Sequence, residues 1–355
     1  MLVEQQVTNY HIRDTIGRRH RWYPWLDTRR VLGLQAHCNE WESRMDTQIR
    51  ILVVCQNKGG DGKSTLTRLV AEFASRNQLR VLLIDMDPQC NLSKRFLAME
   101  TRGGLGAAIP PVHPDYVEGA DDWDGRSSIA DAFTGRINKY GLAPYPTPDE
   151  HIDILPGSGQ EMREAELVRR EEVLEKIVEQ LRVLLHSPDM AELYDLVVID
   201  TPPAKSPLVQ SAIRAATHMV IPTQMAQQSI EGLHEMILQW RIENRNRPAA
   251  EQLQLIGVLP NKCRPVAIQT GLRDALGKDK ALAPFLIPMK IGERTVFAEA
   301  DHPDAQPKSV FDLPTSDKAR QEATAACSYI LHRMQFPVEA PAVAAEPMTE
   351  WVDHE

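Results

Sequence analysis

Cysteine, long apolar runs and an excess of basic charge are all scarce or missing in this chain of 355 residues. Its five cysteines are scattered without a CxxC pair, so a disulfide-stapled or secreted protein is not expected. No apolar run approaches the ~20 residues that a membrane-spanning helix needs, and the N-terminus has no apolar signal region. We therefore expect a cytoplasmic protein with no membrane segment.

Acidic residues outnumber basic ones, 49 to 40, which gives a formal charge of −9. This balance argues against a protein coated in positive charge for nucleic acid, but it leaves room for a local basic face. Hydrophobic residues make up 43% of the chain, so a substantial buried core can form.

Three segments differ in composition from the main domain, which we place at residues 50–336. Residues 1–49 form an Arg- and Trp-containing extension, and residues 18–30 alternate cations with aromatic rings. That pattern is typical of nucleic-acid or phosphate-binding surfaces, with an arm packed on the main domain as the alternative. Gly, Pro and Asp accumulate at residues 102–124, which predicts a surface insertion. Residues 337–355 contain five acids and no Lys or Arg, which predicts a disordered acidic tail.

From residue 50 onward, short β-branched runs alternate with amphipathic helical stretches, and most of the runs are continuously apolar. This pattern predicts an α/β fold with a doubly wound, mostly parallel sheet and helices on both faces. The helix at 161–186 would bury an apolar stripe beginning at Leu167, and Thr315 or Ser316 would cap the last helix. The expected strands are 51–55, 81–85, 152–155, 196–200, 218–222, 255–259 and 285–287, and the expected helices include 63–76, 161–186, 229–244 and 316–335.

A glycine-rich segment, GGDGKS at residues 59–64, follows the first expected strand and opens the first expected helix. This is the context of a phosphate-binding loop (P-loop). Glycines let backbone N–H groups curl around triphosphate oxygens, and the helix adds its positive N-terminal end. Lys63 would neutralise the β and γ phosphates, and the Ser64 hydroxyl would coordinate Mg²⁺.

A second lysine, Lys58, opens this loop, so that residues 58–65 read KGGDGKST. One later strand continues as LLIDMDPQCN (82–91) and another as LVVIDTPP (196–203). These three motifs resemble the deviant Walker A, second and Walker B motifs of the ParA/MinD branch of P-loop NTPases. The similarity continues through IPT (221–223), EGL (231–233) and IP (287–288), and covers about residues 50–335. Asp-Pro-Gln in the second motif favours ParA-type partitioning ATPases over MinD.

The resemblance implies a slow, partner-stimulated ATPase that binds ATP and Mg²⁺ and forms a homodimer with ATP bound. The catalytic set would be Asp87, which positions the attacking water, Lys63, and Lys58, which reaches the partner subunit's ATP. Ser64, Asp85 and Asp200 would serve the metal, with a cap or turn role as the alternative for both Asp85 and Asp87. Asn261 would read the adenine edge or act as a turn residue. The expected nucleotide-binding residues are Lys58, Gly59, Gly60, Asp61, Gly62, Lys63, Ser64, Thr65, Asn261 and Pro288, with Met289 as a second residue beside the base.

Asp61 departs from the family pattern, in which this position is usually small or apolar. A carboxylate near the triphosphate would repel it by about 1 kcal/mol at about 4 Å in water, and by more where water is excluded. The side chain either points away from the phosphates or meets a cation across the dimer.

The resemblance also implies non-specific DNA binding by the ATP dimer and stimulation by a ParB-type centromere-binding protein, and hence a nucleoid-associated location. Two basic clusters could supply the phosphate contacts, Arg241, Arg245 and Arg247, and Lys278, Lys280, Lys290 and Arg294. Acidic neighbours interrupt both, so ordinary solvated surface is the alternative. Residues 1–49 are too few for the helix-turn-helix domain of larger ParA proteins.

Three other functions remain as alternatives. A MinD-like membrane switch would need a basic amphipathic C-terminal helix, whereas this tail is acidic. A metabolic relative would need an added substrate domain or paired cluster cysteines. A regulator that positions a conjugation, secretion or chemotaxis machine would carry the same ATPase motifs, so the sequence does not separate it from a partition protein.

Overall fold

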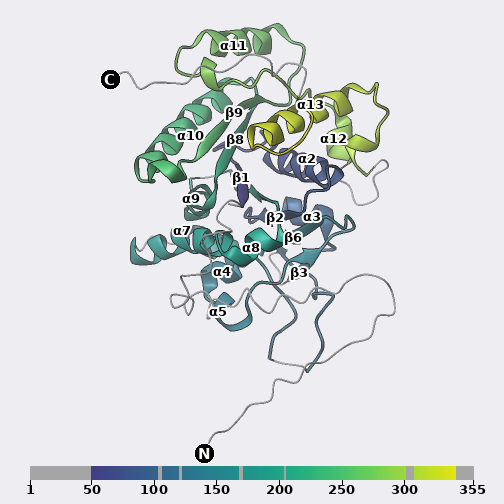
Figure 1. Ribbon diagram of the computed structural model, residues 1–355, viewed down its shortest axis with the longest axis vertical. Helices are drawn as coiled ribbons and strands as arrows, with labels where there is room; N and C mark the ends of the chain where they lie inside the picture. Colours follow the sequence, from purple (N-terminus) through teal and green to yellow (C-terminus); the bar gives the residue numbers. More distant parts are fainter. Residues whose placement is uncertain are drawn as a thin grey trace, which may run out of the picture.

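The computed structural model describes residues 49–102, 106–119, 122–167, 171–203, 205–300 and 308–340. The extension predicted at residues 1–49, apart from its last residue, and most of the predicted tail lie outside these ranges. The described residues contain a seven-stranded sheet in the order β5-β6-β2-β7-β1-β8-β9 (Figure 1). All neighbouring strands are parallel except β5 and β6. The strands are β1 (Arg50–Val54), β2 (Val81–Asp85), β5 (Tyr145–Pro146), β6 (Ile152–Leu155), β7 (Leu196–Asp200), β8 (His218–Thr223) and β9 (Gln254–Pro260).

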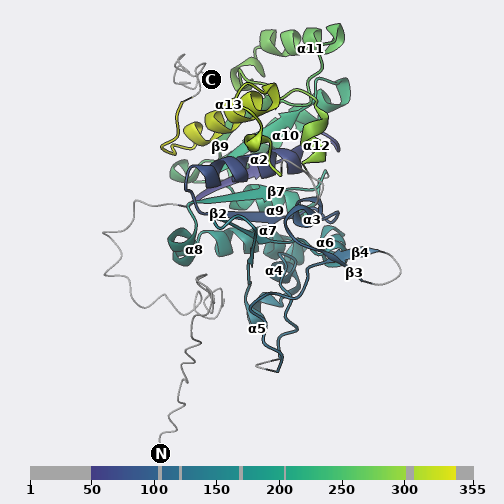
Figure 2. The same cartoon turned by 90° about the vertical axis from the view of Figure 1, so that its right-hand side faces the viewer.

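Helices cover both faces of this sheet, because its central strands are apolar on both sides. The side chains of β2 and β7 are buried along their whole length. One apolar core joins the sheet to α2 (Lys63–Arg76) and α13 (Lys318–Arg333). The other joins it to α7 (Glu171–Leu185), α9 (Pro207–Ala215) and α10 (Gln227–Arg245). Figure 2 shows α2 and α13 on one side of β2 and β7, and α7 and α9 on the other. The predicted doubly wound α/β fold is confirmed.

Smaller elements complete the described chain. The short helices α8, α11 and α12 follow α7, β9 and η3 respectively, and three single-turn 3₁₀ helices connect other elements. No helix in the described ranges is both long enough and apolar enough to cross a bilayer. The remaining bounds are α3 (Asn91–Phe96), α4 (Asp131–Thr134), α5 (Ile137–Tyr140), α6 (Gly159–Glu166), α8 (Pro188–Leu193), α11 (Ala267–Lys278), α12 (Thr295–Glu299), η2 (Ala249–Glu251), η3 (Ala283–Phe285) and η4 (Val310–Asp312).

Three local predictions were wrong. The single helix expected at 161–186 is two helices, α6 and α7, and Leu167 ends α6 with 70% of its surface exposed instead of joining an apolar stripe. The strand expected at 285–287 is replaced by η3 and one isolated bridge from Leu286 to Val258. Pro284 lacks the N–H that a strand ladder needs. The cap expected at Thr315 or Ser316 is instead Asp317, whose carboxylate accepts hydrogen bonds from the N–H groups of Ala319 and Arg320 at the start of α13.

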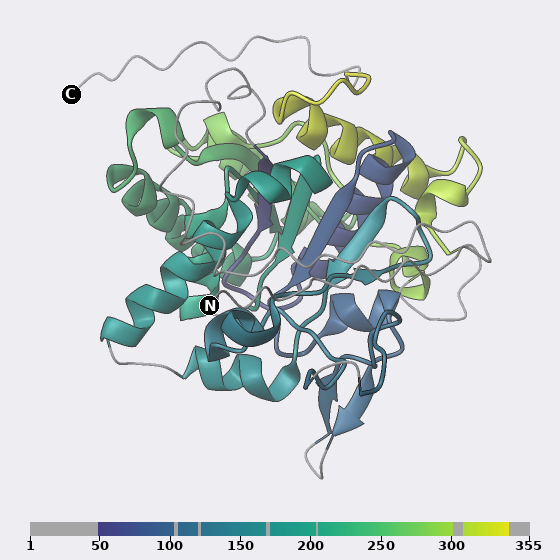
Figure 3. The same ribbon diagram turned by 60° about the horizontal axis from the view of Figure 1, so that its bottom comes forward.

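The predicted insertion at 102–124 is built around a hairpin outside the main sheet. Strand β3 (Glu100–Arg102) pairs antiparallel with β4 (Ala107–Ile109), and the hairpin projects from the body of the molecule (Figure 3). The chain after it is anchored by rings: the His113 ring lies 4.6 Å from Tyr145 and 5.9 Å from Trp123, measured between centroids. The ring contact of His113 therefore joins the insertion to Tyr145 of β5.

Candidate nucleotide site

The candidate site lies at the carboxyl edge of the central strands. Strand β1 lies between β7 and β8, so the loop that follows β1 meets the ends of both neighbours. Asp85 at the end of β2 lies opposite Asp200 at the end of β7, which is itself opposite Val54 at the end of β1. From β1 the chain continues to β2, which lies toward the β5 end of the sheet, and from β7 it continues to β8, which lies toward the β9 end. Ligands of doubly wound folds bind at such a switch point.

The P-loop has the backbone geometry of an anion cradle. Gly60 and Gly62 adopt φ values of 87° and 82°, which residues with a side chain rarely do. Gly62 caps α2, and no side chain satisfies the N–H groups of its first turn. These unpaired donors and the positive end of the helix favour a bound phosphate. A Cβ on Gly62 would lie 2.4 Å from Nδ2 of Asn261, so this glycine has no room for a side chain.

Lys63 is held inside the loop. Its ammonium donates a 3.1 Å hydrogen bond to the carbonyl of Lys58, and the side chain is buried. Burial lowers its pKa, while Asp200, Asp87 and Asp61 act in the opposite direction. The predicted P-loop lysine is thus one cation surrounded by three carboxylates. A bound phosphate would compete with each of these carboxylates for the Lys63 ammonium.

Asp200 is fully buried, and within the described residues neither of its carboxylate oxygens accepts a hydrogen bond of normal geometry. Burial and the nearby Asp85 raise its pKa well above the usual range, and the Ser64 hydroxyl, which lies close by, lowers it. A buried carboxylate without donors calls for a cation or an ordered water. Asp200 with Ser64 therefore fits Mg²⁺, which takes few protein ligands and completes its shell with water and phosphate oxygens. The described ranges contain no cluster of three or more His, Cys, Asp or Glu side chains able to hold a metal by themselves.

Asp85 and Asp87 have different surroundings. One oxygen of Asp85 accepts from the N–H and hydroxyl of Ser93, at 2.8 Å and 2.6 Å, and the other accepts from the N–H of Asp87 at 3.1 Å. These bonds fit the turn role that is the alternative to metal support, and a metal role for Asp85 stays a prediction. Asp87 accepts at one oxygen from the N–H of Gln89, at 2.8 Å, and keeps 8% of its surface exposed. Burial raises its pKa, with Gln89 and Lys63 opposing.

Asp61 is buried, and its side chain contacts residues of its own chain. Its Oδ1 accepts from the hydroxyl of Ser229 at 2.8 Å and from the N–H of Gln224 at 3.2 Å, and the Gln224 side chain donates to the Gly60 carbonyl at 2.7 Å. These contacts fasten the P-loop to the start of α10. The sequence analysis missed Gln224 and Ser229 because they lie 163 and 168 residues from Asp61 and belong to no spaced motif.

Asn261 and Pro288 were both expected beside the adenine. The Asn261 amide donates to the Asp61 carbonyl at 2.8 Å, so the structure gives it a role in holding the P-loop. Pro288 is exposed in the loop after η3, and Met289 is buried. Contact with the base stays a prediction for these residues. The remaining expected positions, Lys58, Gly59 and Thr65, lie in or directly after the P-loop, and Lys58 is half-buried.

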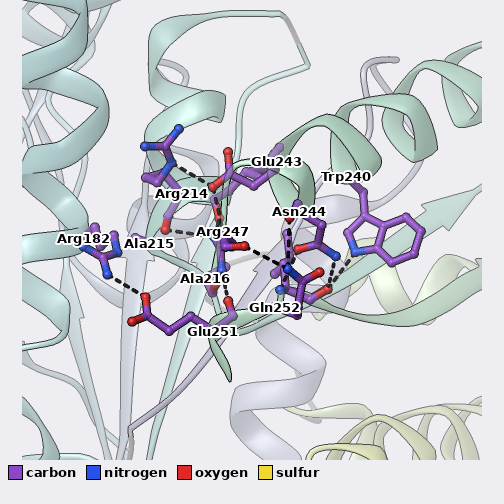
Figure 4. A network of polar contacts seen from close by, with 12 residues as sticks. Arg182, Arg214, Ala215, Ala216, Trp240, Glu243, Asn244, Arg247, Glu251 and Gln252 are labelled. Atoms are coloured by element: carbon purple, nitrogen blue, oxygen red, sulfur yellow. Dashed lines mark hydrogen bonds and ion pairs between the residues drawn. The ribbon is translucent and has the colours of Figure 1, made fainter. Parts of the chain in front are cut away.

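Two members of the predicted basic clusters contact other residues of the chain. Arg247 is half-buried in a network with Glu243 and the end of α9, and Arg294 donates to Glu322 at 2.7 Å (Figure 4 shows the first network). Contact of either cluster with DNA stays a prediction. The exposed members are Arg241 and Arg245 on α10, and Lys278, Lys280 and Lys290.

Comparisons with known proteins agree with this geometry. The family model AAA_31, described as an AAA domain, matches residues 49–254, more than half of the chain. The chromosome-partitioning ATPase Soj of Thermus thermophilus is 28% identical over 212 residues, which cover 60% of this chain and 69% of Soj. The protein IncC of Escherichia coli is 25% identical over 296 residues, which cover 82% of this chain and 71% of IncC. Among solved structures, McdA from Cyanothece superposes with a TM-score of 0.60 at 18% identity, over 80% of this chain and 99% of McdA, which supports the fold alone.

Proposed function

This chain belongs to the AAA_31 family of AAA domains, and from that premise we propose that it is a slow, partner-stimulated ATPase that partitions plasmid or chromosomal DNA. In this proposal it dimerises with ATP bound, binds DNA without sequence preference and works with a ParB-type protein. The observation that carries the ATPase part is the buried Asp200 carboxylate, whose oxygens accept no hydrogen bond of normal geometry from the described residues, beside the glycine-capped helix of the P-loop. The similarity to Soj and IncC supports the partition part.

The proposed chemistry is attack of water on the γ-phosphate, which needs in-line placement and neutralisation of charge. The P-loop N–H groups and Lys63 would bind the phosphates, releasing the Lys63 ammonium from the Lys58 carbonyl. Ser64 and Asp200 would hold Mg²⁺, which when bound neutralises charge on the phosphate oxygens. Asp87 would orient the water, since it lies near Lys63 and stays partly accessible. Asp85 would keep the loop that carries Asp87 in place.

Lys58 is the residue through which the proposal predicts a dimer. It stands at the mouth of the P-loop, and its stem lies 3.1 Å from the position of a Cβ on Gly232 of α10. Within the described residues no hydrogen bond or ion pair is recorded for its ammonium, so the charge is free to bind a phosphate outside its own P-loop. The predicted role across a dimer interface needs such a free cation.

The experiment is light scattering with and without ATP and Mg²⁺, followed by a salt titration of binding to random-sequence duplex DNA. ATP-dependent dimerisation and DNA affinity that falls steeply with salt are the expected results, because phosphate contacts release counterions. A monomer that stays monomeric with MgATP would contradict the dimer. A dimer that does not bind DNA would contradict the partition role and favour the second candidate.

That second candidate is a regulator that positions a protein machine with the same ATP switch. The outer face of α10 favours it: Leu238 and Ile242 are 57% and 49% exposed, next to Arg241 and Arg245. DNA phosphates need the arginines but not the apolar pair, whereas a protein surface would use both. Replacing Leu238 and Ile242 with Ser and retaining both arginines should leave DNA binding intact if DNA is the ligand.

A further inference from the structure

Asp61 leaves one charge at the phosphate site unexplained. The side chain is completely buried, and its Oδ2 has no hydrogen-bond partner in the described residues. Ser229 and Gln224 both donate to the other oxygen. A buried carboxylate beside a triphosphate would oppose nucleotide binding unless a cation offsets it.

Lys262 is the cation placed to do so. Two lysines, Lys63 and Lys262, act on the Asp61 carboxylate electrostatically, and Lys63 already serves Asp200 and Asp87 as well. Lys262 comes from the loop after β9, directly beyond Asn261. Its Cε lies 3.5 Å from the position that a Cβ on Gly62 would take, which puts its stem against the cap of α2.

The backbone conformation of Lys262 and the contacts around it also support a role in the phosphate site. Its φ of 50° lies in the left-handed region, which is costly for a residue with a side chain and is common at ligand-binding positions. Glu293 is an acidic neighbour of Lys262, and it already binds the guanidinium of Arg264. No hydrogen bond or ion pair is recorded for the Lys262 ammonium among the described residues.

We propose that Lys262 is a further cation of the phosphate site, which offsets Asp61 and binds nucleotide phosphate at the N-terminal end of α2. The inference rests on the proposed ATPase function. It assigns the loop after β9 a charge-bearing role, in addition to the base contact predicted for Asn261. It also gives Asp61, the unusual acid in the P-loop, a compensating cation from the same subunit.

The test measures ATP binding by calorimetry in the presence of Mg²⁺, using the full chain. Lys262→Gln keeps a polar side chain but removes the charge, and should weaken affinity roughly tenfold, as expected for one charge-assisted hydrogen bond. Lys262→Arg should stay near the parental affinity. Lys318→Gln, the same substitution at an exposed lysine at the start of α13, is the matched control and should bind like the parent. Melting curves without nucleotide check that each variant is folded.

Repeating the Lys262→Gln substitution in a variant without the Asp61 carboxylate separates compensation of Asp61 from a simple loss of positive charge. In Asp61→Asn, the Lys262→Gln substitution should weaken ATP binding clearly less than it does in the parent, because the phosphate contact is still lost but no buried carboxylate is left to offset. Asp61→Ala serves the same purpose if Asp61→Asn does not fold. Equal affinity of Lys262→Gln and the parent, or an equal loss in both backgrounds, would overturn the inference. If the parent itself does not bind ATP, the proposed function fails instead, and the two failures are distinguishable.

Discussion

The amino and carboxyl edges of the central sheet differ in whether their charged side chains are paired. At the amino edge, the charged side chains satisfy one another and the ends of the elements. At the carboxyl edge, both carboxylate oxygens of Asp200 and Oδ2 of Asp61 are buried and accept no hydrogen bond of normal geometry from the described residues. Buried polar groups are normally paired, because an unpaired one costs roughly 1–3 kcal/mol. The contrast indicates that the amino edge stabilises the fold and the carboxyl edge is built for a ligand.

Arg247 illustrates the amino edge. It donates to Glu243 and to the carbonyls of Ile213, Arg214, Ala216 and Glu251 (Figure 4). The first three of these carbonyls belong to the end of α9, where backbone acceptors lack helical partners. Arg80 does similar work before β2, where it pairs with Asp195 at 2.8 Å and donates to the Glu192 carbonyl. Arginine suits this position because its five donors fit several acceptors at once.

The largest expected effect comes from the carboxyl edge. Lys63→Ala should weaken MgATP binding by at least about 100-fold, because the loop loses its cation while Asp200, Asp87 and Asp61 remain. Calorimetry measures the affinity, and circular dichroism checks the fold. Unchanged ATP affinity would contradict the placement of the nucleotide site.

Asp87→Ala should separate binding from chemistry. We expect ATP affinity near the parental value and hydrolysis slower by at least about 100-fold, because the attacking water loses its orienting carboxylate. The ATP-bound dimer should then accumulate in light scattering. Phosphate release at the parental rate would show that Asp87 is not the water-positioning residue.

Arg247→Ala should break the amino edge without touching the ligand site. It removes bonds to one carboxylate and four carbonyls, so the free energy of unfolding should fall by about 3 kcal/mol. Arg245→Ala, two residues earlier and exposed, is the matched control and should change it by less than about 0.5 kcal/mol. Urea unfolding measures both. DNA affinity should show the reverse order, with the loss confined to Arg245→Ala, if α10 binds phosphates.

The smallest effect is a pH dependence at the amino edge. His218 begins β8, and burial together with Arg50 and Arg333 lowers its pKa to about 4. The folded protein therefore favours the neutral ring. This stability is present above pH 6.5, the ordinary pKa, and is lost as the pH falls toward 4, by about 2 kcal/mol after allowance for partial exposure.

Two buried acids oppose this change in the same pH window. Burial raises the pKa of Asp85 and of Asp131 to about 6, so protonation of either one favours the folded state as the pH falls. The contribution of His218 is isolated by comparing urea unfolding of the parent and of His218→Gln at pH 7 and pH 4. The variant should lose about 2 kcal/mol less on acidification, and parallel losses would contradict the assignment.

Local patterns predicted much of the fold. The expected bounds of β2, β6, β7 and α2 match the structure, since continuous apolar runs and a glycine loop before a helix depend on neighbouring residues. The predictions failed where the local pattern alone did not decide the secondary structure. A three-residue apolar stretch after Pro284 gained one bridge and not a strand, and the helical pattern at 161–186 was interrupted near Leu167.

The sequence by itself determined the parallel α/β architecture, the P-loop and the identity of the acids that end β2 and β7, because each is written in a short continuous segment. Tertiary structure alone decided which charges are paired. It turned Asp61 toward Gln224 and Ser229, enclosed Arg247 among the carbonyls of α9, and brought Lys262 to the cap of α2. The physical reason is that partners for a buried charge come from whichever strand ends lie side by side, and strand order brings together residues that are far apart in the chain, such as Asp61 and Asn261, which are separated by 200 positions.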